Sequence, residues 1–156
     1  MGSTERDILD RIVTDLTAIN GSGSYDYDFS GGDQVMIGMK AQPNRLPSAH
    51  IFPLRLSTSQ SPGRTPLRRY DREFRVQIDV YVPATGDEPG NAIKAALDAQ
   101  DDVMLALELD RSLGSTGVHD IEIEASAYDG AELDLGPGLG VSTLLLTVRY
   151  SETGGS

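Results

Sequence analysis

The stretch Glu-Phe-Arg-Val-Gln-Ile-Asp-Val-Tyr-Val, residues 73–82, alternates polar and apolar side chains without a break. Successive side chains of a strand point to opposite faces, so this alternation predicts a β-strand with one apolar face. That face comprises Phe74, Val76, Ile78, Val80 and Val82. Pro83 ends the pattern, because proline has no N–H to donate to a neighbouring strand. A strand of roughly 30 Å, at ~3.3 Å per residue, is expected inside a sheet with neighbours on both edges.

Two amphipathic helices are predicted, one before and one after this strand. The first begins at Ser3 or Thr4 and ends at Asn20-Gly21, and its apolar stripe is Ile8, Leu9, Ile12, Val13, Leu16 and Ile19. The second runs from Asn91 to about Leu113. One of its faces is formed by Ile93, Ala96, Leu97, Gln100, Val103, Met104 and Leu107, and the other largely by Lys94, Asp98, Asp101, Asp102 and Glu108. Both helices therefore have a face to bury.

Five further segments have the composition of strands: residues 25–29, 35–39, 50–56, 120–128 and 141–150. The first two are candidates for a hairpin, and Pro53 assigns the third to an edge or a bulge. The last two, joined by a glycine-rich loop, predict an antiparallel pair. We therefore expect an α+β fold in which a mainly antiparallel or mixed sheet has two helices packed on one face.

A basic segment lies between the third of these candidates and the central strand. Residues 57–70 predict a long exposed loop, because prolines and a glycine are embedded among small polar residues. Five of the 13 basic residues fall in or beside this loop: Arg64, Arg68, Arg69, Arg72 and Arg75. The 156 residues suit a single domain, with an ordered core at about 4–151 and a disordered tail at 152–156.

Composition restricts the function classes. The net charge of −11, from 24 acidic and 13 basic residues, argues against a surface that coats nucleic acid. The chain has no cysteine, which excludes disulfides, thiolate metal sites and cysteine nucleophiles. Neither a signal sequence nor a membrane segment is recognisable, so we expect a protein made in a cytoplasm with no membrane contact.

Catalytic and metal-binding signatures are missing from the sequence. The two histidines, His50 and His119, have no accompanying motif, and no EF-hand or zinc-protease spacing occurs. Acidic pairs such as Asp101-Asp102 are too common at this charge to identify a general acid and base. We therefore predict no enzymatic activity, no cofactor and no metal.

Apolar side chains also occur outside the main stripe of the second helix. Leu105 and Leu109 make its last turns apolar nearly all round, which predicts a second contact surface there. Within a monomer a folded-back loop would cover it, and in an oligomer a neighbouring subunit would do so.

The pattern as a whole resembles the tail terminator proteins of long-tailed bacteriophages, the group of the lambda minor tail protein U. Four segments carry the resemblance: Arg-Asp-Ile-Leu-Asp-Arg-Ile-Val-Thr-Asp-Leu (6–16), Tyr-Asp-Arg-Glu-Phe-Arg-Val-Gln-Ile-Asp-Val-Tyr-Val (70–82), Ala-Ala-Leu-Asp-Ala-Gln-Asp-Asp-Val-Met-Leu-Ala-Leu (95–107) and Leu-Leu-Leu-Thr-Val-Arg-Tyr (144–150). It extends over residues 5–151. These similarities are architectural, and other neck and tail-completion proteins share the plan.

The resemblance implies a structural virion protein of the phage tail and neck. Such a protein forms a ring, usually of six copies, that caps the tail tube, ends its polymerisation and offers a joining surface to the head–tail connector. DNA would pass through the ring without specific binding, and an acidic wall would repel its phosphates. Ring closure between acidic copies requires opposite charges across each junction, for which Arg64, Arg68, Arg69, Arg72 and Arg75 are the candidates.

Two other hypotheses stay open at this stage. A small α+β ligand-binding domain or enzyme would use a cleft near Tyr25, Tyr27 and His50. An adaptor module would bind one partner through Leu105 and Leu109. The arginines, in turn, could simply be solvated residues of a loop that improve solubility.

Overall fold

The computed structural model describes residues 4–38, 46–54, 59–60, 69–86, 88, 90–114, 117–133 and 138–153. Its elements are α1 (Thr4–Thr17), β1 (Val35–Ile37), β2 (Ser48–Leu54), β3 (Ser59–Gln60), β4 (Arg69–Pro83), α2 (Asn91–Glu108), β5 (Val118–Asp129), the 3-10 turn η1 (Gly130–Leu133) and β6 (Leu139–Thr153). The strands form one sheet in the order β1-β2-β4-β6-β5, with β3 beside β4. Among the described strands only β1 and β2 are parallel to each other, so the sheet is mixed but mainly antiparallel.

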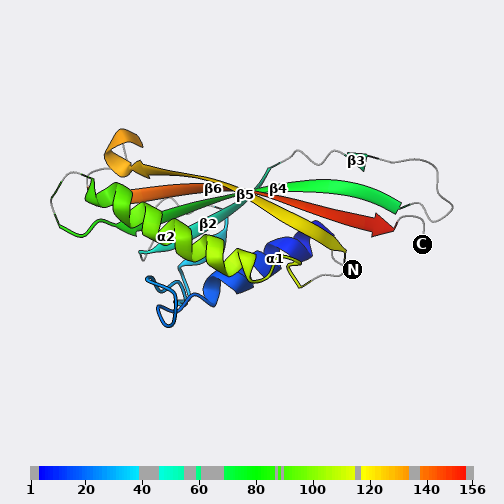
Figure 1. Cartoon of the computed structure of the whole chain (residues 1–156), viewed down its shortest axis with the longest axis horizontal. Helices are drawn as coiled ribbons and strands as arrows, with labels where there is room; N and C mark the ends of the chain where they lie inside the picture. Colours follow the sequence, from blue (N-terminus) through cyan, green and yellow to red (C-terminus); the bar gives the residue numbers. More distant parts are fainter. Residues whose placement is uncertain are drawn as a thin grey trace.

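Both helices cover the same face of this sheet (Figure 1). α2 packs on β4, β5 and β6, whereas α1 contacts α2, β1 and β2. The core between the layers is built from Ile8, Ile12 and Leu16 of α1, Val103 and Leu107 of α2, and Ile78, Leu144 and Leu146 of the sheet, among others. The predicted α+β fold is confirmed.

The strand that alternates at residues 73–82 is central, as predicted. β4 pairs with β2 on one side and with β6 along its whole length on the other. The predicted apolar face, Phe74 to Val82 at every second residue, is buried in the core. The strand is longer than expected, because pairing with β6 continues back to Arg69. β4 and β6 therefore project beyond the helices at one end of the molecule, next to the C-terminus in Figure 1.

The bounds of β3, β4 and β6 differ from two predictions made from the sequence. The expected loop at 57–70 contains β3 and the first residues of β4, while residues 55–58 and 61–68 lie outside the described part of the chain. The disordered tail was predicted to begin at residue 152, which is too early. In the structure Glu152 and Thr153 still belong to β6 and pair with Tyr70 and Arg69 of β4. Residues 154–156 are not described.

The buried face of α2 differs from the predicted one. Leu97, assigned to the apolar face, is 44% exposed, whereas Asp102, assigned to the polar face, is 3% exposed. The buried residues are instead Ala92, Ala95, Ala96, Ala99, Asp102, Val103, Ala106 and Leu107. Small alanine side chains let the helix backbone approach the sheet closely, which weighting by hydrophobicity does not anticipate. The helix also ends at Glu108, and turns continue the chain to Gly114.

No strand forms at residues 25–29, contrary to the prediction. The segment consists of turns and bends with one isolated bridge between Asn20 and Asp28. Its backbone is held by α2: the Asp102 carboxylate accepts hydrogen bonds from the N–H groups of Asp26 and Tyr27, at 2.8–3.1 Å. These donors are consequently unavailable to a neighbouring strand. The alternate aromatic residues still pack inward, and Phe29 is fully buried.

The strand around His50 is an edge over only part of its length. β1 does not form the predicted hairpin but pairs in parallel with Ala49–Ile51. Pro53 lies beyond β1, where β2 has β4 alone as a described partner. Proline is tolerated at that position because no N–H is needed on the outer side.

Candidate assembly surfaces

The predicted cluster of arginines is divided by the structure. Arg64 and Arg68 lie outside the described residues, and Arg69 is the first residue of β4. Arg72 and Arg75 lie on opposite faces of β4, because they are an odd number of residues apart. Arg72 is half-buried on the side of Phe74, across from Tyr150, whereas Arg75 is half-buried on the outer face, across from Thr147.

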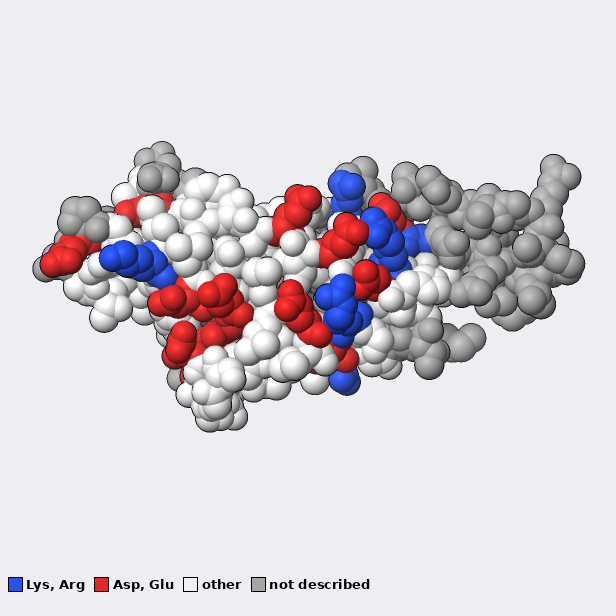
Figure 2. Space-filling view, in the orientation of Figure 1, with Lys and Arg blue, Asp and Glu red and all other residues white. Residues whose placement is uncertain are grey.

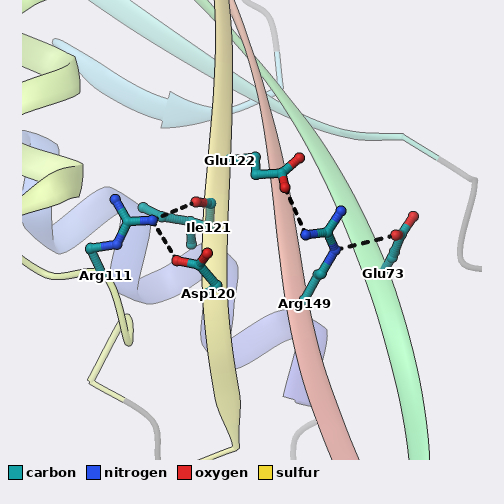
Figure 3. Close-up of polar contacts among 6 residues, drawn as sticks. All are labelled: Glu73, Arg111, Asp120, Ile121, Glu122 and Arg149. Carbon is teal, nitrogen blue, oxygen red and sulfur yellow. Dashed lines mark hydrogen bonds and ion pairs between the residues drawn. The ribbon is translucent and has the colours of Figure 1, made fainter.

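The outer face of the sheet, opposite the helices, carries a charge network that joins three strands. Arg149 of β6 donates to Glu122 of β5 at 2.7 Å and to Glu73 of β4 at 3.4 Å (Figure 3). The Glu122 carboxylate, followed by Glu73, raises the pKa of Arg149. All three side chains are about half exposed, so the network contributes modestly to stability. It makes the outer face a surface of alternating charge.

A second ion pair lies at the edge of the sheet. Arg111, in the turn after α2, donates to the Asp120 carboxylate and to the Ile121 carbonyl at 3.0 Å (Figure 3). The Arg111 guanidinium and then the Ile121 N–H lower the pKa of Asp120. One guanidinium therefore joins the end of α2 to β5.

Acidic residues gather along the outer side of α2, as Figure 2 shows. Asp98, Asp101 and Glu108 are exposed there, next to the exposed Leu97 and the half-buried Leu105. Leu109 follows directly after the helix and is 74% exposed. The predicted second contact surface at Leu105 and Leu109 is thus accessible in the single chain.

The cleft hypothesised near Tyr25, Tyr27 and His50 is not formed by these residues. His50 is fully buried; its Nδ1 bonds the Gly38 carbonyl at 3.2 Å, and its Nε2 lies 3.3 Å from the Ser48 hydroxyl. The Tyr27 hydroxyl donates to the Ala95 carbonyl of α2 at 3.4 Å. His50 is therefore a satisfied core residue. His119 is exposed at a bulge in β5 and hydrogen-bonds the Ser151 hydroxyl.

An ionisable cluster connects α1 to the turn after α2. The Arg11 Nε donates to Asp110 at 2.7 Å and lies 3.4 Å from Asp15. The Asp15 side chain is 11% exposed, and its Oδ2 has no hydrogen-bond partner among the described residues. Burial, reinforced by the nearby Asp110 carboxylate, raises the pKa of Asp15 to about 7. The proton of this pair therefore resides on Asp15.

This cluster predicts a pH dependence of stability. A raised folded-state pKa means that the folded chain holds a proton that the unfolded chain releases, between the ordinary value of 3.8 and about 7. Stability should therefore fall as the pH rises through this interval, by up to roughly 4 kcal/mol from this group. Asp15→Asn should flatten the profile of urea unfolding against pH, whereas Asp10→Asn, at an exposed position, should not. An identical profile for wild type and Asp15→Asn would contradict this assignment.

Three further observations concern metal ions, grooves and membrane helices in the described part of the chain. No group of three or more His, Asp or Glu side chains is placed there to hold a metal ion. An open groove lies between α1 and the turn after α2, lined by Thr4, Asp7, Ile8, Asp10, Arg11, Thr14, Leu113 and Gly114. Neither of the described helices is long and apolar enough to cross a membrane.

Comparisons with known proteins give no assignment: no protein-family model matches the chain, and no curated protein matches it either.

Sequence reasoning missed Arg111 and Arg149. The position of Arg149 could have been predicted, because side chains alternate along a strand. Val148 faces the core, so Arg149 lies on the outer face, which also carries Glu73 and Glu122. Arg111 had none, since its position depends on where α2 ends and how the following turn returns to β5.

Proposed function

We propose that this protein is a structural subunit of a bacteriophage tail, a tail terminator. It assembles into a ring of about six copies that caps the tail tube, stops tube polymerisation and provides the joining surface for the head–tail connector. It belongs to the virion, at the neck end of the tail, and is made in the host cytoplasm late in infection. It acts by geometry and needs no enzymatic activity and no cofactor.

The observation that supports this proposal best is the acidic outer side of α2, where Asp98, Asp101 and Glu108 are exposed beside Leu97. The sequence supplies basic residues for an opposite patch in Arg64, Arg68 and Arg69, whose side chains lie outside the described part of the structure. A ring requires two different patches that match head to tail, unlike a two-fold dimer, whose single patch matches itself. Opposite charges on the two patches favour the correct register and speed encounter.

The acidic character of the chain agrees with the proposed passage of DNA. With a net charge of −11 per copy, a ring wall would repel phosphates and let DNA slide through without binding. The same net charge makes neighbouring copies repel one another, so each junction must bring opposite charges together.

The role of the arginines is tested by reversing two of them. We expect Arg68→Glu combined with Arg69→Glu to leave a folded monomer but to impair ring formation and tail assembly, because like charges would then meet at the junction. Circular dichroism and native mass spectrometry measure the two effects separately. Arg6→Glu, an exposed reversal on α1, is the control and should assemble normally. Normal ring formation and normal infectivity of the double variant would show that these arginines have no role in assembly.

A second candidate function is an adaptor that binds one partner protein through α2. Leu105 and Leu109 favour it, because they lie one helical turn apart, Leu109 is exposed, and neighbouring apolar side chains at a surface suit a partner. Leu109→Asp distinguishes the two proposals: in an adaptor it abolishes a stable heterodimer, and in a terminator it weakens a ring. Another neck or tail-completion role is the alternative that the resemblance itself leaves open, because those proteins share the same plan.

A further inference from the structure

β5 is the last strand at its edge of the sheet in the part of the chain that the structure describes. It pairs with β6 from Asp120 to Asp129, and no other described strand lies on its far side. A long strand with one free edge presents a row of backbone N–H and C=O groups that another polypeptide can pair with. Proteins commonly block such edges, so the part of the edge that is blocked is informative.

The bond from Arg111 identifies which groups face outward. In an antiparallel pair, residues alternate between those bonded to the partner strand and those whose N–H and C=O point away. Because Arg111 binds the Ile121 carbonyl and the Asp120 carboxylate receives the Ile121 N–H, the backbone groups of Ile121 point away from β6. The uninterrupted register then places the outward groups of Ile123, Ala125 and Ala127 along the same edge. Ile121 is thus blocked, and no described backbone group pairs with the edge after it.

Side chains on the open part of the edge differ between the two faces. Ile123, Ala125 and Ala127 are half-buried on the helix side and pack against the core. Glu122 and Glu124 are exposed on the outer face. Glu122 is compensated by Arg149, whereas Glu124 has no hydrogen bond or ion pair with any described residue. The open edge therefore carries negative charge that the described chain does not neutralise.

This charge argues against pairing of β5 with β5 of a second copy. A two-fold antiparallel pair centred near Glu124 would set glutamates of the two copies opposite or diagonal to each other. Like charges at such cross-strand positions are destabilising, whereas opposite charges stabilise the pair. Arg111 already shows the favoured chemistry, because its guanidinium binds both a carbonyl and a carboxylate of this edge.

We propose that the β5 edge, from Ile123 to Ala127, binds an extended segment of a partner protein in which basic and small apolar residues alternate. The segment adds as a further strand to the sheet. Its basic side chains lie beside Glu122 and Glu124 on the outer face, and its apolar side chains lie beside Ile123 and Ala125 on the helix side. The Arg111–Asp120 pair marks the end of the site. This inference goes beyond the proposed ring and does not depend on it.

A capped synthetic peptide of alternating lysine and valine is the probe. Amide hydrogen exchange, followed by NMR on the full chain, should slow at Ile123, Ala125 and Ala127 when the peptide is added, with no change at Ile121. A peptide with glutamate in place of lysine should not protect these amides. Binding should weaken with salt, because it depends on charge pairing at an exposed edge.

Two variants test the site itself. Ala125→Pro removes an outward N–H that β6 does not use, so the variant should fold yet lose protection by the peptide. Glu124→Lys, which does not alter the backbone, should weaken binding of the lysine peptide about tenfold and admit the glutamate peptide. Ala125→Val keeps the N–H and is the matched control for the proline variant.

Several results would overturn the proposal. These are the absence of binding, protection elsewhere than on β5, unchanged affinity in Glu124→Lys, and equal binding of both peptides. Protection of Ile123, Ala125 and Ala127 on raising the protein concentration without peptide would assign the edge to a second copy instead. Ring assembly that persists in Glu124→Lys would leave the terminator proposal intact while peptide binding is lost, so the two proposals fail separately.

Discussion

Gly140→Ala should destabilise the fold strongly, although it adds only one methyl group. A Cβ at Gly140 would lie 2.2 Å from the Ala92 carbonyl oxygen and 3.1 Å from the Ala96 nitrogen, both in the backbone of α2. A backbone cannot rotate out of the way as a side chain can, so α2 must move off the sheet. We expect a loss of about 3 kcal/mol in the free energy of unfolding, measured by urea denaturation.

Gly32→Ala is the matched control for this experiment. Gly32 is exposed, and an added Cβ there would meet no atom within 4 Å. Its substitution should change stability by no more than ~0.5 kcal/mol. Equal unfolding midpoints for Gly140→Ala and wild type would mean that α2 does not lie against β6 as described.

Asp102→Ala should be the most damaging change of a polar residue. The carboxylate is buried and accepts three hydrogen bonds from the backbone N–H groups of Asp26 and Tyr27. Burial raises the pKa of Asp102, while these two N–H groups oppose the rise. Truncation leaves two backbone donors without their acceptor, so we expect a loss of ~2–3 kcal/mol in the free energy of unfolding.

The neighbouring residue supplies the control. Asp101→Ala removes the same chemical group from an exposed position one residue away and should be nearly neutral. The loss in Asp102→Ala should also appear as faster amide exchange at Asp26 and Tyr27, because their segment is tied to α2 by this carboxylate. Similar stabilities for the two alanine variants would refute the anchoring role.

Several elements could be predicted from sequence because their signal is local. β4 alternates in a way that only a strand with one buried face explains, β6 has a strand-like and largely apolar run at residues 141–150, and α1 repeats its apolar residues at helical spacing. The pairing of β4 with neighbours on both edges followed from its length alone. The α+β layering then followed from the need of two helical stripes for a common sheet face.

The remaining features depend on contacts between distant residues. From the sequence, Asp102 is predicted to be a surface residue. In the structure its carboxylate accepts hydrogen bonds from the N–H groups of Asp26 and Tyr27, and these bonds also prevent a strand at residues 25–29. The buried face of α2 is set by alanines that fit closely over Gly140. A prediction based on the size and hydrophobicity of the α2 side chains therefore turns the wrong face of the helix toward the sheet. The opposite faces of Arg72 and Arg75, by contrast, follow from their odd spacing along one strand and could have been predicted from the sequence.

The candidate site stays a prediction. Leu105 and Leu109 were predicted as a contact surface from their position outside the apolar stripe, and in the structure Leu109 is exposed. The networks around Arg111 and Arg149 and the open edge of β5 required the register of the sheet, which the sequence does not contain. The function assigned to these surfaces stays a proposal that rests on the resemblance and on the acidic outer side of α2.

The central claim is that copies of this chain close into a ring. Purified wild-type protein should be measured by native mass spectrometry at several salt concentrations and imaged by negative-stain electron microscopy. We predict a single closed oligomer of about six copies with a central hole. A monomer at every concentration and salt condition, with no ring in any image, would contradict the claim.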